Sequence, residues 1–179
     1  MKQALLIIDV QNDYFKAGDM ELVEPEQALM QINQLEDHFL KQSLPIIYVQ
    51  HIAASDAPFF RENSNGVQLH QDLRYTTDAI LVAKKYPNSF YQTRLQQILL
   101  EQGIEQLVIV GMMTHMCIDS TTRAAKELGY QPILISDATA TRTLQFDGQT
   151  VAAHQVQLAY LSALSNFADI QTTHDYLYS

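Results

Sequence analysis

The sequence predicts a three-layer α/β/α domain with a mainly parallel sheet of five or six strands. Short apolar runs, most of them ended by a charged or turn-forming residue, alternate along the chain with stretches of helical periodicity. This alternation calls for right-handed crossovers, which place helices on both faces of a parallel sheet. With 179 residues, 47% of them hydrophobic, the chain can bury one continuous core, so we expect residues 1–179 to form a single domain.

The first expected strand covers residues 4–8, an apolar run that ends at Asp9. A run without polar positions is typical of a strand buried on both faces of a parallel sheet. Residues 25–42 have apolar side chains at helical spacing, and Pro25 stands near the first turn, where proline is tolerated. The next expected strands are residues 45–50 and 79–83.

A long segment without periodicity, residues 51–77, separates these two strands. Its turn-forming residues are Pro58, Asn63, Asn65 and Gly66. Loops of this length in compact domains are usually functional, so we expect a lid or a ligand-contacting loop here.

The second half of the chain continues the alternation. The elements expected there are a helix at 91–102 closed by Gly103, a strand at 106–111, a helix at 120–129, a strand at 131–136, a helix at 150–167 and a sixth strand at 168–172.

Cys117, the only cysteine, falls on the turn between the strand at 106–111 and the helix at 120–129. At such a turn, free backbone N–H groups and the helix dipole stabilise a thiolate, and the same N–H groups can receive an oxyanion. The position favours a nucleophile. A small buried hydrophobic residue is the alternative.

Asp9 and Lys84 also follow directly after apolar strands, as Cys117 does. Ligands of parallel sheets bind outside the carboxyl ends of the strands, so the three residues predict a common site. There, Asp9 can accept the thiol proton, and the Lys84 ammonium can stabilise carboxylate and thiolate. The alternatives are a structural cap for Asp9 and a solvated surface charge for Lys84, which lies beside Lys85.

The six histidines do not form a metal-binding pattern. No His-x-His, His-x-x-x-His or Asp-x-His pair is present, so we expect no metal and no cofactor. Binding of a metal through His51 or His70 in the long loop is left open. A Cys–His dyad through His115 is also left open.

Composition limits the possible partners. The net charge of -9, without a basic cluster, opposes binding to nucleic acid or to anionic membranes. The apolar runs are too short to span a bilayer, no leader segment is visible, and a lone cysteine fits a reducing compartment. We therefore expect a cytoplasmic protein whose partners are small molecules and its own copies.

Three separated segments resemble the isochorismatase-like cysteine hydrolases, a family that includes nicotinamidases, carbamoylases and related amidases. They occur in the family's order and span most of the chain. The segments are Leu6-Ile-Ile-Asp-Val-Gln-Asn-Asp13, Lys84-Lys-Tyr-Pro-Asn-Ser-Phe90, and Gly111-Met-Met-Thr-His-Met-Cys-Ile-Asp119 followed by Thr122-Arg-Ala-Ala125.

The resemblance implies a Rossmann-like fold and a catalytic triad of Asp9, Lys84 and Cys117. It also implies a non-proline cis peptide bond at Met112-Met113 and an oxyanion hole formed by the backbone N–H groups of Met113 and Cys117. An amide substrate would then be cleaved through a thioester, and the protein would be a homo-oligomer, a dimer or a tetramer. By position in the motifs, substrate-binding side chains are expected at Tyr14 and Phe90, with Phe59 or Phe60 added from the long loop. Core packing is the alternative for all of these aromatic residues.

Two departures narrow the expected activity. Nicotinamidases carry an Asp-x-His metal cluster after the second strand, whereas this chain has His51-Ile52-Ala53. True isochorismatases typically lack the cysteine, since vinyl-ether hydrolysis does not need it. The leading hypothesis is a metal-independent cysteine amidohydrolase of a small amide or carbamoyl compound. The alternatives are a vinyl-ether hydrolase, a nicotinamidase, and a non-catalytic binding or assembly subunit.

Overall fold

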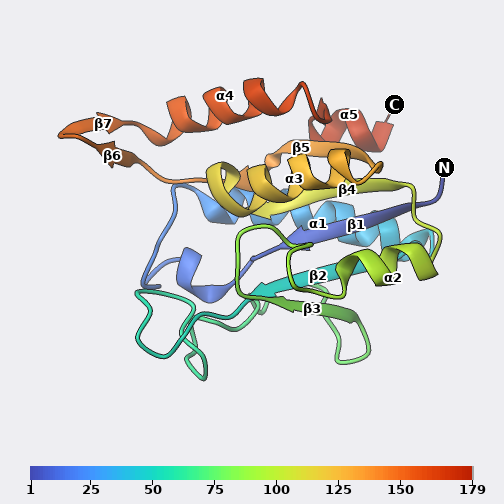
Figure 1. The fold of residues 1–179 in the computed structure, drawn as a ribbon, viewed down its shortest axis with the longest axis horizontal. Helices are drawn as coiled ribbons and strands as arrows, with labels where there is room; N and C mark the ends of the chain where they lie inside the picture. The colour runs from blue at the N-terminus through green and yellow to red at the C-terminus, as the bar shows by residue number, and fades with distance from the viewer. Residues whose placement is uncertain (179) are drawn as a thin grey trace.

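The computed structural model describes residues 1–178, which form a six-stranded parallel sheet with helices on both faces (Figure 1). The strand order is β3-β2-β1-β4-β5-β8, and every neighbouring pair is parallel. The predicted fold class is therefore confirmed. The strands are β1 (Gln3–Ile8), β2 (Ile46–His51), β3 (Ile80–Lys84), β4 (Gln106–Met112), β5 (Gln131–Ala140) and β8 (Asp169–Gln171).

Two buried clusters, one on each face of the sheet, result from the alternation of side chains along each strand. In β1, Leu5 and Ile7 belong to the cluster that includes α1 (Pro25–Lys41), whereas Leu6 and Ile8 belong to the opposite one. The opposite cluster includes side chains from α2 (Leu95–Glu101), α3 (Asp119–Glu127) and α4 (Ala153–Leu164), and α5 (Thr173–Tyr178) lies on the α1 side. Burial on both faces explains why β1 has no polar residue after Gln3.

Two predicted helices begin later than their periodicity indicates. The helix expected from residue 91 begins at Leu95, because the Thr93 hydroxyl accepts the Leu95 N–H at 3.2 Å and donates to Ser89 O at 2.6 Å. The helix expected from residue 150 begins at Ala153, because a hairpin of β6 (Leu144–Phe146) and β7 (Gln149–Val151) precedes it. Asp147 and Gly148 both have positive φ angles in its turn, as in type I′ hairpins.

A short helical turn lies shortly after each of the strands β1 and β4. These turns are η1 (Asn12–Tyr14) and η2 (Thr114–Ile118), and η2 continues directly into α3. Among the residues that the structure describes, no helix is both long and apolar enough to cross a membrane.

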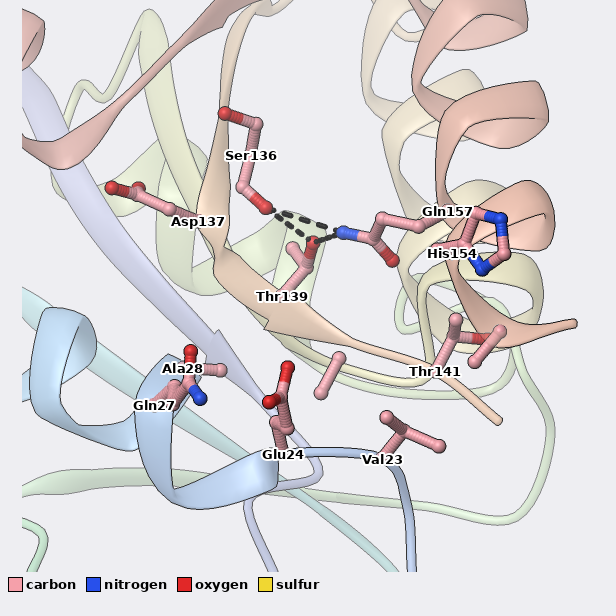
Figure 2. A pocket seen from close by; sticks show the side chains of 12 residues that line it. Val23, Glu24, Gln27, Ala28, Ser136, Asp137, Thr139, Thr141, His154 and Gln157 are labelled. Atoms are coloured by element: carbon pink, nitrogen blue, oxygen red, sulfur yellow. Dashed lines mark hydrogen bonds between the residues drawn. The ribbon is translucent and has the colours of Figure 1, made fainter. Parts of the chain in front are cut away.

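A cavity of about 290 Å³ lies at the carboxyl end of β5, between the start of α1 and the start of α4 (Figure 2). Gln157 reaches into it from α4, and its Nε2 donates to Ser136 O at 3.2 Å and to Thr139 Oγ1 at 2.7 Å. Its Oε1 accepts the Thr114 hydroxyl at 2.7 Å. This bond ties α4 to the turn that contains Cys117, but Asp9, Lys84 and Cys117 do not line this cavity.

Candidate active site

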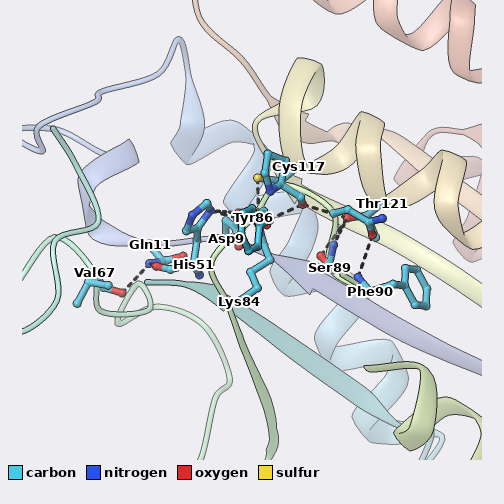
Figure 3. Close-up of polar contacts among 12 residues, drawn as sticks. Asp9, Gln11, His51, Val67, Lys84, Tyr86, Ser89, Phe90, Cys117 and Thr121 are labelled. Carbon is cyan, nitrogen blue, oxygen red and sulfur yellow. Dashed lines mark hydrogen bonds and ion pairs between the residues drawn. The ribbon is translucent and has the colours of Figure 1, made fainter. Parts of the chain in front are cut away.

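The three residues predicted to share a site meet at the carboxyl ends of β1, β3 and β4 (Figure 3). Asp9 follows β1, Lys84 is the last residue of β3, and Cys117 lies in η2 after β4. Lys84 Nζ is 2.8 Å from Asp9 Oδ2 and 3.0 Å from Cys117 Sγ, and all three side chains are buried. The structure thus brings the whole predicted set into direct contact.

Asp9 and Lys84 form a buried ion pair. Burial is the largest single effect and raises the pKa of Asp9. The Lys84 charge, together with smaller contributions from His51 and Cys117, outweighs it, and the net shift is below the ordinary value of 3.8. Burial lowers the pKa of Lys84, but Asp9 and then Cys117 raise it, and the net shift is above the ordinary value of 10.5. Both groups are therefore charged at neutral pH.

Cys117 is a thiol in the resting protein. Burial is the main effect that raises the pKa of this thiol, and the Asp9 carboxylate raises it further, although the Lys84 ammonium acts in the opposite direction. The expected preference for a thiolate at the strand-to-helix turn is outweighed by burial and by Asp9. A thiolate therefore has to form by transfer of its proton to a base.

Asp9 is placed to be that base. No N–H or O–H among residues 1–178 makes a well-directed hydrogen bond to Asp9 Oδ1, and Lys84 approaches the other oxygen. Asp9 is also close enough to the thiol to raise its pKa. A buried carboxylate oxygen without a directed donor can accept the thiol proton.

Lys84 is held from its far side by backbone carbonyl groups. Its Nζ donates to Tyr86 O at 3.1 Å and to Pro87 O at 3.2 Å. The same loop is fixed to α3, because Thr121 Oγ1 accepts the Ser89 N–H at 3.0 Å and donates to Ser89 Oγ at 2.9 Å (Figure 3). These contacts orient the ammonium toward Asp9 and Cys117, and no sequence pattern indicates them.

The Gln11 side chain connects the site to the long loop between β2 and β3 through hydrogen bonds. Its Nε2 donates to His51 O at 2.9 Å and to Val67 O at 2.7 Å, and its Oε1 accepts the His51 N–H at 2.8 Å (Figure 3). His51 Nδ1 consequently lies 3.3 Å from Lys84 Nζ and 3.8 Å from Asp9 Oδ2. Both residues belong to the site, although sequence reasoning assigned no role to Gln11.

Tyr14 and Phe60, two of the predicted substrate-binding residues, lie together. Both are buried, their ring centroids are 4.6 Å apart, and the Phe60 ring is 5.8 Å from the His51 ring. The third, Phe90, is directed away from Cys117 and stacks on Tyr130 at 5.8 Å (Figure 3). This position fits the core-packing alternative for Phe90.

The backbone at the end of β4 contains a cis peptide bond between Met112 and Met113. Met113 directly precedes η2, and its carbonyl accepts the N–H groups of Met116 and Ile118. The other residue considered there, His115, has a different partner: its Nδ1 is 2.6 Å from Thr141 Oγ1, and no hydrogen bond joins it to Cys117 among the residues described. A Cys–His dyad through His115 is not formed.

The family model for the Isochorismatase domain matches residues 3–175. The chain belongs to the isochorismatase family of hydrolases. It is 42% identical over 179 residues to the uncharacterized isochorismatase family protein YddQ of Bacillus subtilis (strain 168), with 99% of each chain covered. It is also similar to the crystal structure of a candidate isochorismatase hydrolase from Oleispira antarctica, with a TM-score of 0.96, 41% identity, and 99% of this chain and 97% of that chain covered.

A more distant relative, Nicotinamidase 3 of Arabidopsis thaliana, is 27% identical over 171 residues, which cover 88% of this chain and 83% of that protein. The resemblance expected from the three motifs is therefore confirmed. For this isochorismatase-family hydrolase, however, the family alone does not fix the bond that is cleaved, because its relatives differ in activity.

One group of potential metal ligands exists in this family member among residues 1–178. Ligand atoms of Asp9, His51 and Cys117 lie within 4.8 Å of one another. Lys84 Nζ lies within 3.3 Å of an atom of each of the three, and a second cation placed among them would be repelled by this ammonium. The donor set therefore does not fit a divalent ion while Lys84 is charged. His70 lies outside the group, with its ring 4.1 Å from that of Phe15.

Proposed function

We propose that the protein is a metal-independent cysteine amidohydrolase that cleaves the C–N bond of a small amide or carbamoyl compound. The observation that carries this proposal is the buried contact of one ammonium, Lys84 Nζ, with both a carboxylate, Asp9 Oδ2, and a thiol, Cys117 Sγ. A charged base and a nucleophile linked by a cation are the groups that acyl transfer from an amide requires.

In the first half of the proposed reaction, Cys117 Sγ attacks the substrate carbonyl carbon while its proton passes to Asp9. The backbone N–H groups of Met113 and Cys117 stabilise the oxyanion that forms. Asp9 then returns the proton to the leaving nitrogen, the C–N bond breaks, and ammonia or an amine departs. The acyl group is left on Cys117 as a thioester.

In the second half, water attacks the thioester carbonyl while Asp9 takes a proton from it. The C–S bond breaks, the carboxylic acid product leaves, and the Cys117 thiol is restored with the proton from Asp9. Lys84 stays charged throughout, because the carboxylate, the sulfur and two carbonyl oxygens surround it. Its role is electrostatic, and it keeps Asp9 and Cys117 at a fixed distance.

Hydrolysis of a panel of amides, ureas and carbamoyl acids, with nicotinamide and isochorismate included and a chelator present, tests the proposal. We expect ammonia or amine release by the wild type and loss of release in Cys117→Ala, with an unchanged unfolding temperature as the folding control. Release that persists in Cys117→Ala would contradict the role of the thiol. Pyruvate release from isochorismate that survives Cys117→Ser would instead favour the vinyl-ether alternative.

One further expectation stays a prediction, and one alternative stays open. A homo-oligomer, dimer or tetramer, is expected from the family resemblance, and sedimentation velocity would test it. A non-catalytic binding subunit is the other alternative, and it would be supported if alkylating reagents showed no preference for Cys117 over a denatured control and no panel compound were hydrolysed.

A further inference from the structure

Arg142 is a partly buried arginine without an acidic partner in the described chain. Among residues 1–178, its Nε is shielded from solvent and has no hydrogen-bond partner, and the guanidinium makes one hydrogen bond, from Nη1 to Thr143 O at 3.4 Å. Three other arginines form ion pairs with aspartates; they are Arg61 with Asp19, Arg74 with Asp37, and Arg123 with Asp119. In a chain of net charge -9, a shielded guanidinium without a carboxylate is an exception that calls for a ligand.

The strand pairing puts Arg142 beside the turn that contains Cys117. Thr139 and Ala140 of β5 pair with Gly111 and Met112 of β4, so the chain leaves β5 next to the start of η2. Two contacts fix this exit: Thr141 Oγ1 lies 2.6 Å from His115 Nδ1, and Thr141 O accepts the Val23 N–H at 3.0 Å. The backbone that carries Arg142 is therefore held at the edge of the candidate active site.

Electrostatic effects on Tyr14 agree with this placement. Burial is the main reason why the pKa of Tyr14 is raised; Cys117 raises it as well, whereas Arg142 lowers it. Burial, followed by Arg142, also lowers the pKa of His115. Cys117 and Arg142 thus both lie close enough to Tyr14 to change its pKa, which is expected if they flank one pocket.

A guanidinium binds a carboxylate with two parallel N–H···O bonds, and it stays charged even when it is partly buried. Asp9 cannot serve as this partner, because Lys84 already pairs with it. We propose that Arg142 binds a carboxylate of the substrate, so that the amide or carbamoyl compound hydrolysed at Cys117 is an anion. For the identity of the substrate, this inference rests on the proposed amidase function.

Binding to Cys117→Ala protein tests the inference without turnover. The probes are two matched pairs, succinamate with succinamide and N-carbamoylglycine with N-carbamoylglycinamide, which differ only in the carboxylate. By calorimetry we expect at least one acid to bind on the order of 10- to 100-fold more tightly than its neutral partner, the size of effect that a charge-assisted hydrogen bond gives. Adding Arg142→Gln should remove this preference and leave the affinity for the neutral compound within about threefold.

Arg94→Gln is the matched control, since Arg94 is exposed and lies on another surface. It removes the same charge and should keep the preference for acids. Arg142→Lys keeps the charge without the planar fork and should retain only part of the preference. Equal binding of acids and neutral compounds by Cys117→Ala, or binding to neither member of both pairs, would overturn the inference. So would an equal loss for both members of a pair in Arg142→Gln.

The two proposals can fail separately. If Cys117→Ala prefers the acids but wild-type protein hydrolyses none of the panel, the carboxylate site stands and the amidase function fails. If hydrolysis depends on Cys117 but Arg142→Gln lowers kcat/KM equally for acids and neutral amides, the amidase function stands and the role of Arg142 is wrong.

Discussion

Lys84 sets the charge balance of the candidate site. Its ammonium has three protons, but five acceptors or polar groups lie within 3.3 Å of Nζ: Asp9 Oδ2, Cys117 Sγ, Tyr86 O, Pro87 O and His51 Nδ1. The interaction with sulfur therefore competes with the one with Asp9. In the resting protein the carboxylate is the stronger partner, which is consistent with a protonated Cys117.

Replacing Asp9 with asparagine should shift this balance toward the sulfur. Because the Asp9 carboxylate raises the pKa of Cys117 and the Lys84 ammonium lowers it, Asp9→Asn should lower the pKa of the thiol. Hydrolysis should fall by roughly 10²- to 10⁴-fold, because the general base is lost. The ultraviolet absorbance of the thiolate, titrated with pH and corrected with Cys117→Ala protein, measures the first effect.

Because the chain has a single cysteine, no other thiol contributes once the absorbance of the nine tyrosines has been subtracted with the Cys117→Ala titration. Circular dichroism would show whether Asp9→Asn protein is folded. An Asp9→Asn variant with an unchanged thiolate titration would contradict the proposed coupling of the two groups, and one with wild-type hydrolysis would contradict the role of Asp9 as the base.

At the scale of elements, Gly111 determines how closely β4 approaches β1. Its φ angle is +121°, a conformation that L-residues rarely adopt, and an added methyl group would overlap the backbone of Ile8. Gly111→Ala should therefore destabilise the protein by about 3 kcal/mol or more in urea unfolding. Gly103→Ala is the control, because Gly103 also has positive φ but nothing lies near its Cβ position; its cost should be about 1 to 2 kcal/mol. Equal costs would show that close packing at Gly111 is not important.

Asp13 holds the loop between β2 and β3 in place. Its buried carboxylate accepts the Phe60 N–H at 2.6 Å and the Asp19 N–H at 3.1 Å. Asp13→Asn places an amide group against one of these N–H donors, and an unsatisfied buried donor costs about 1 to 3 kcal/mol. We expect faster amide hydrogen exchange in residues 52–79 and unchanged protection in β4.

Asp19→Asn is the matched control for this loop, because it removes only the exposed ion pair with Arg61. Such pairs contribute about 1 kcal/mol or less, so exchange in the loop should change little. If Asp13→Asn and Asp19→Asn had the same effect, Asp13 would not be the residue that positions Phe60.

The six strands of the main sheet could be predicted from the sequence, because strands buried on both faces of a parallel sheet consist of uninterrupted apolar runs. Leu5 and Leu6 point to opposite faces of the sheet, and both are buried. Burial on both faces is what the unbroken apolar run in the sequence indicates. The hairpin before α4 was missed, although Asp147-Gly148 is a turn signal, since the flanking strands have only three residues each. The start of α2 depends on a local bond of Thr93, which periodicity cannot show.

Site prediction had a different limit. Position after a strand was enough to nominate Asp9, Lys84 and Cys117. The chemistry of a carboxylate, an ammonium and a thiol indicated their roles, and the family resemblance implied the same triad. Gln11 could not be assigned, because its partners are backbone groups 40 and 56 residues away. Arg142 could not be assigned either, because what distinguishes it is the absence of an acidic neighbour in the folded chain described here.

At the scale of the whole molecule, the ion pair between Asp9 and Lys84 joins strands that are not neighbours. β1 and β3 are separated by β2, and Cys117 adds the end of β4 to the same contact. The site therefore exists only when most of the sheet is formed. Its charges contribute to global stability as well as to chemistry.

Breaking this buried pair should destabilise the whole protein. Lys84→Met leaves an unpaired carboxylate at a fully buried position, which typically costs about 3 to 5 kcal/mol. Arg74→Met, which breaks the exposed pair with Asp37, should cost about 1 kcal/mol or less. Urea unfolding at neutral pH measures both, and similar costs would contradict the assignment of Lys84 and Asp9 as a charged pair.

The pH dependence of stability should show the same pair. The folded state lowers the pKa of Asp9 below 3.8, so the stabilisation by its charge is present above that pH and is lost as pH falls through the lower folded value. The folded state raises the pKa of Lys84 above 10.5, so its stabilisation is present below that pH and is lost as pH rises through the higher folded value. The free energy of unfolding of wild-type protein should therefore fall more steeply at both extremes than that of the double variant Asp9→Asn, Lys84→Met. Parallel curves for the two proteins would mean that neither charge is coupled to folding, and the electrostatic role proposed for Lys84 in the reaction would lose its physical basis.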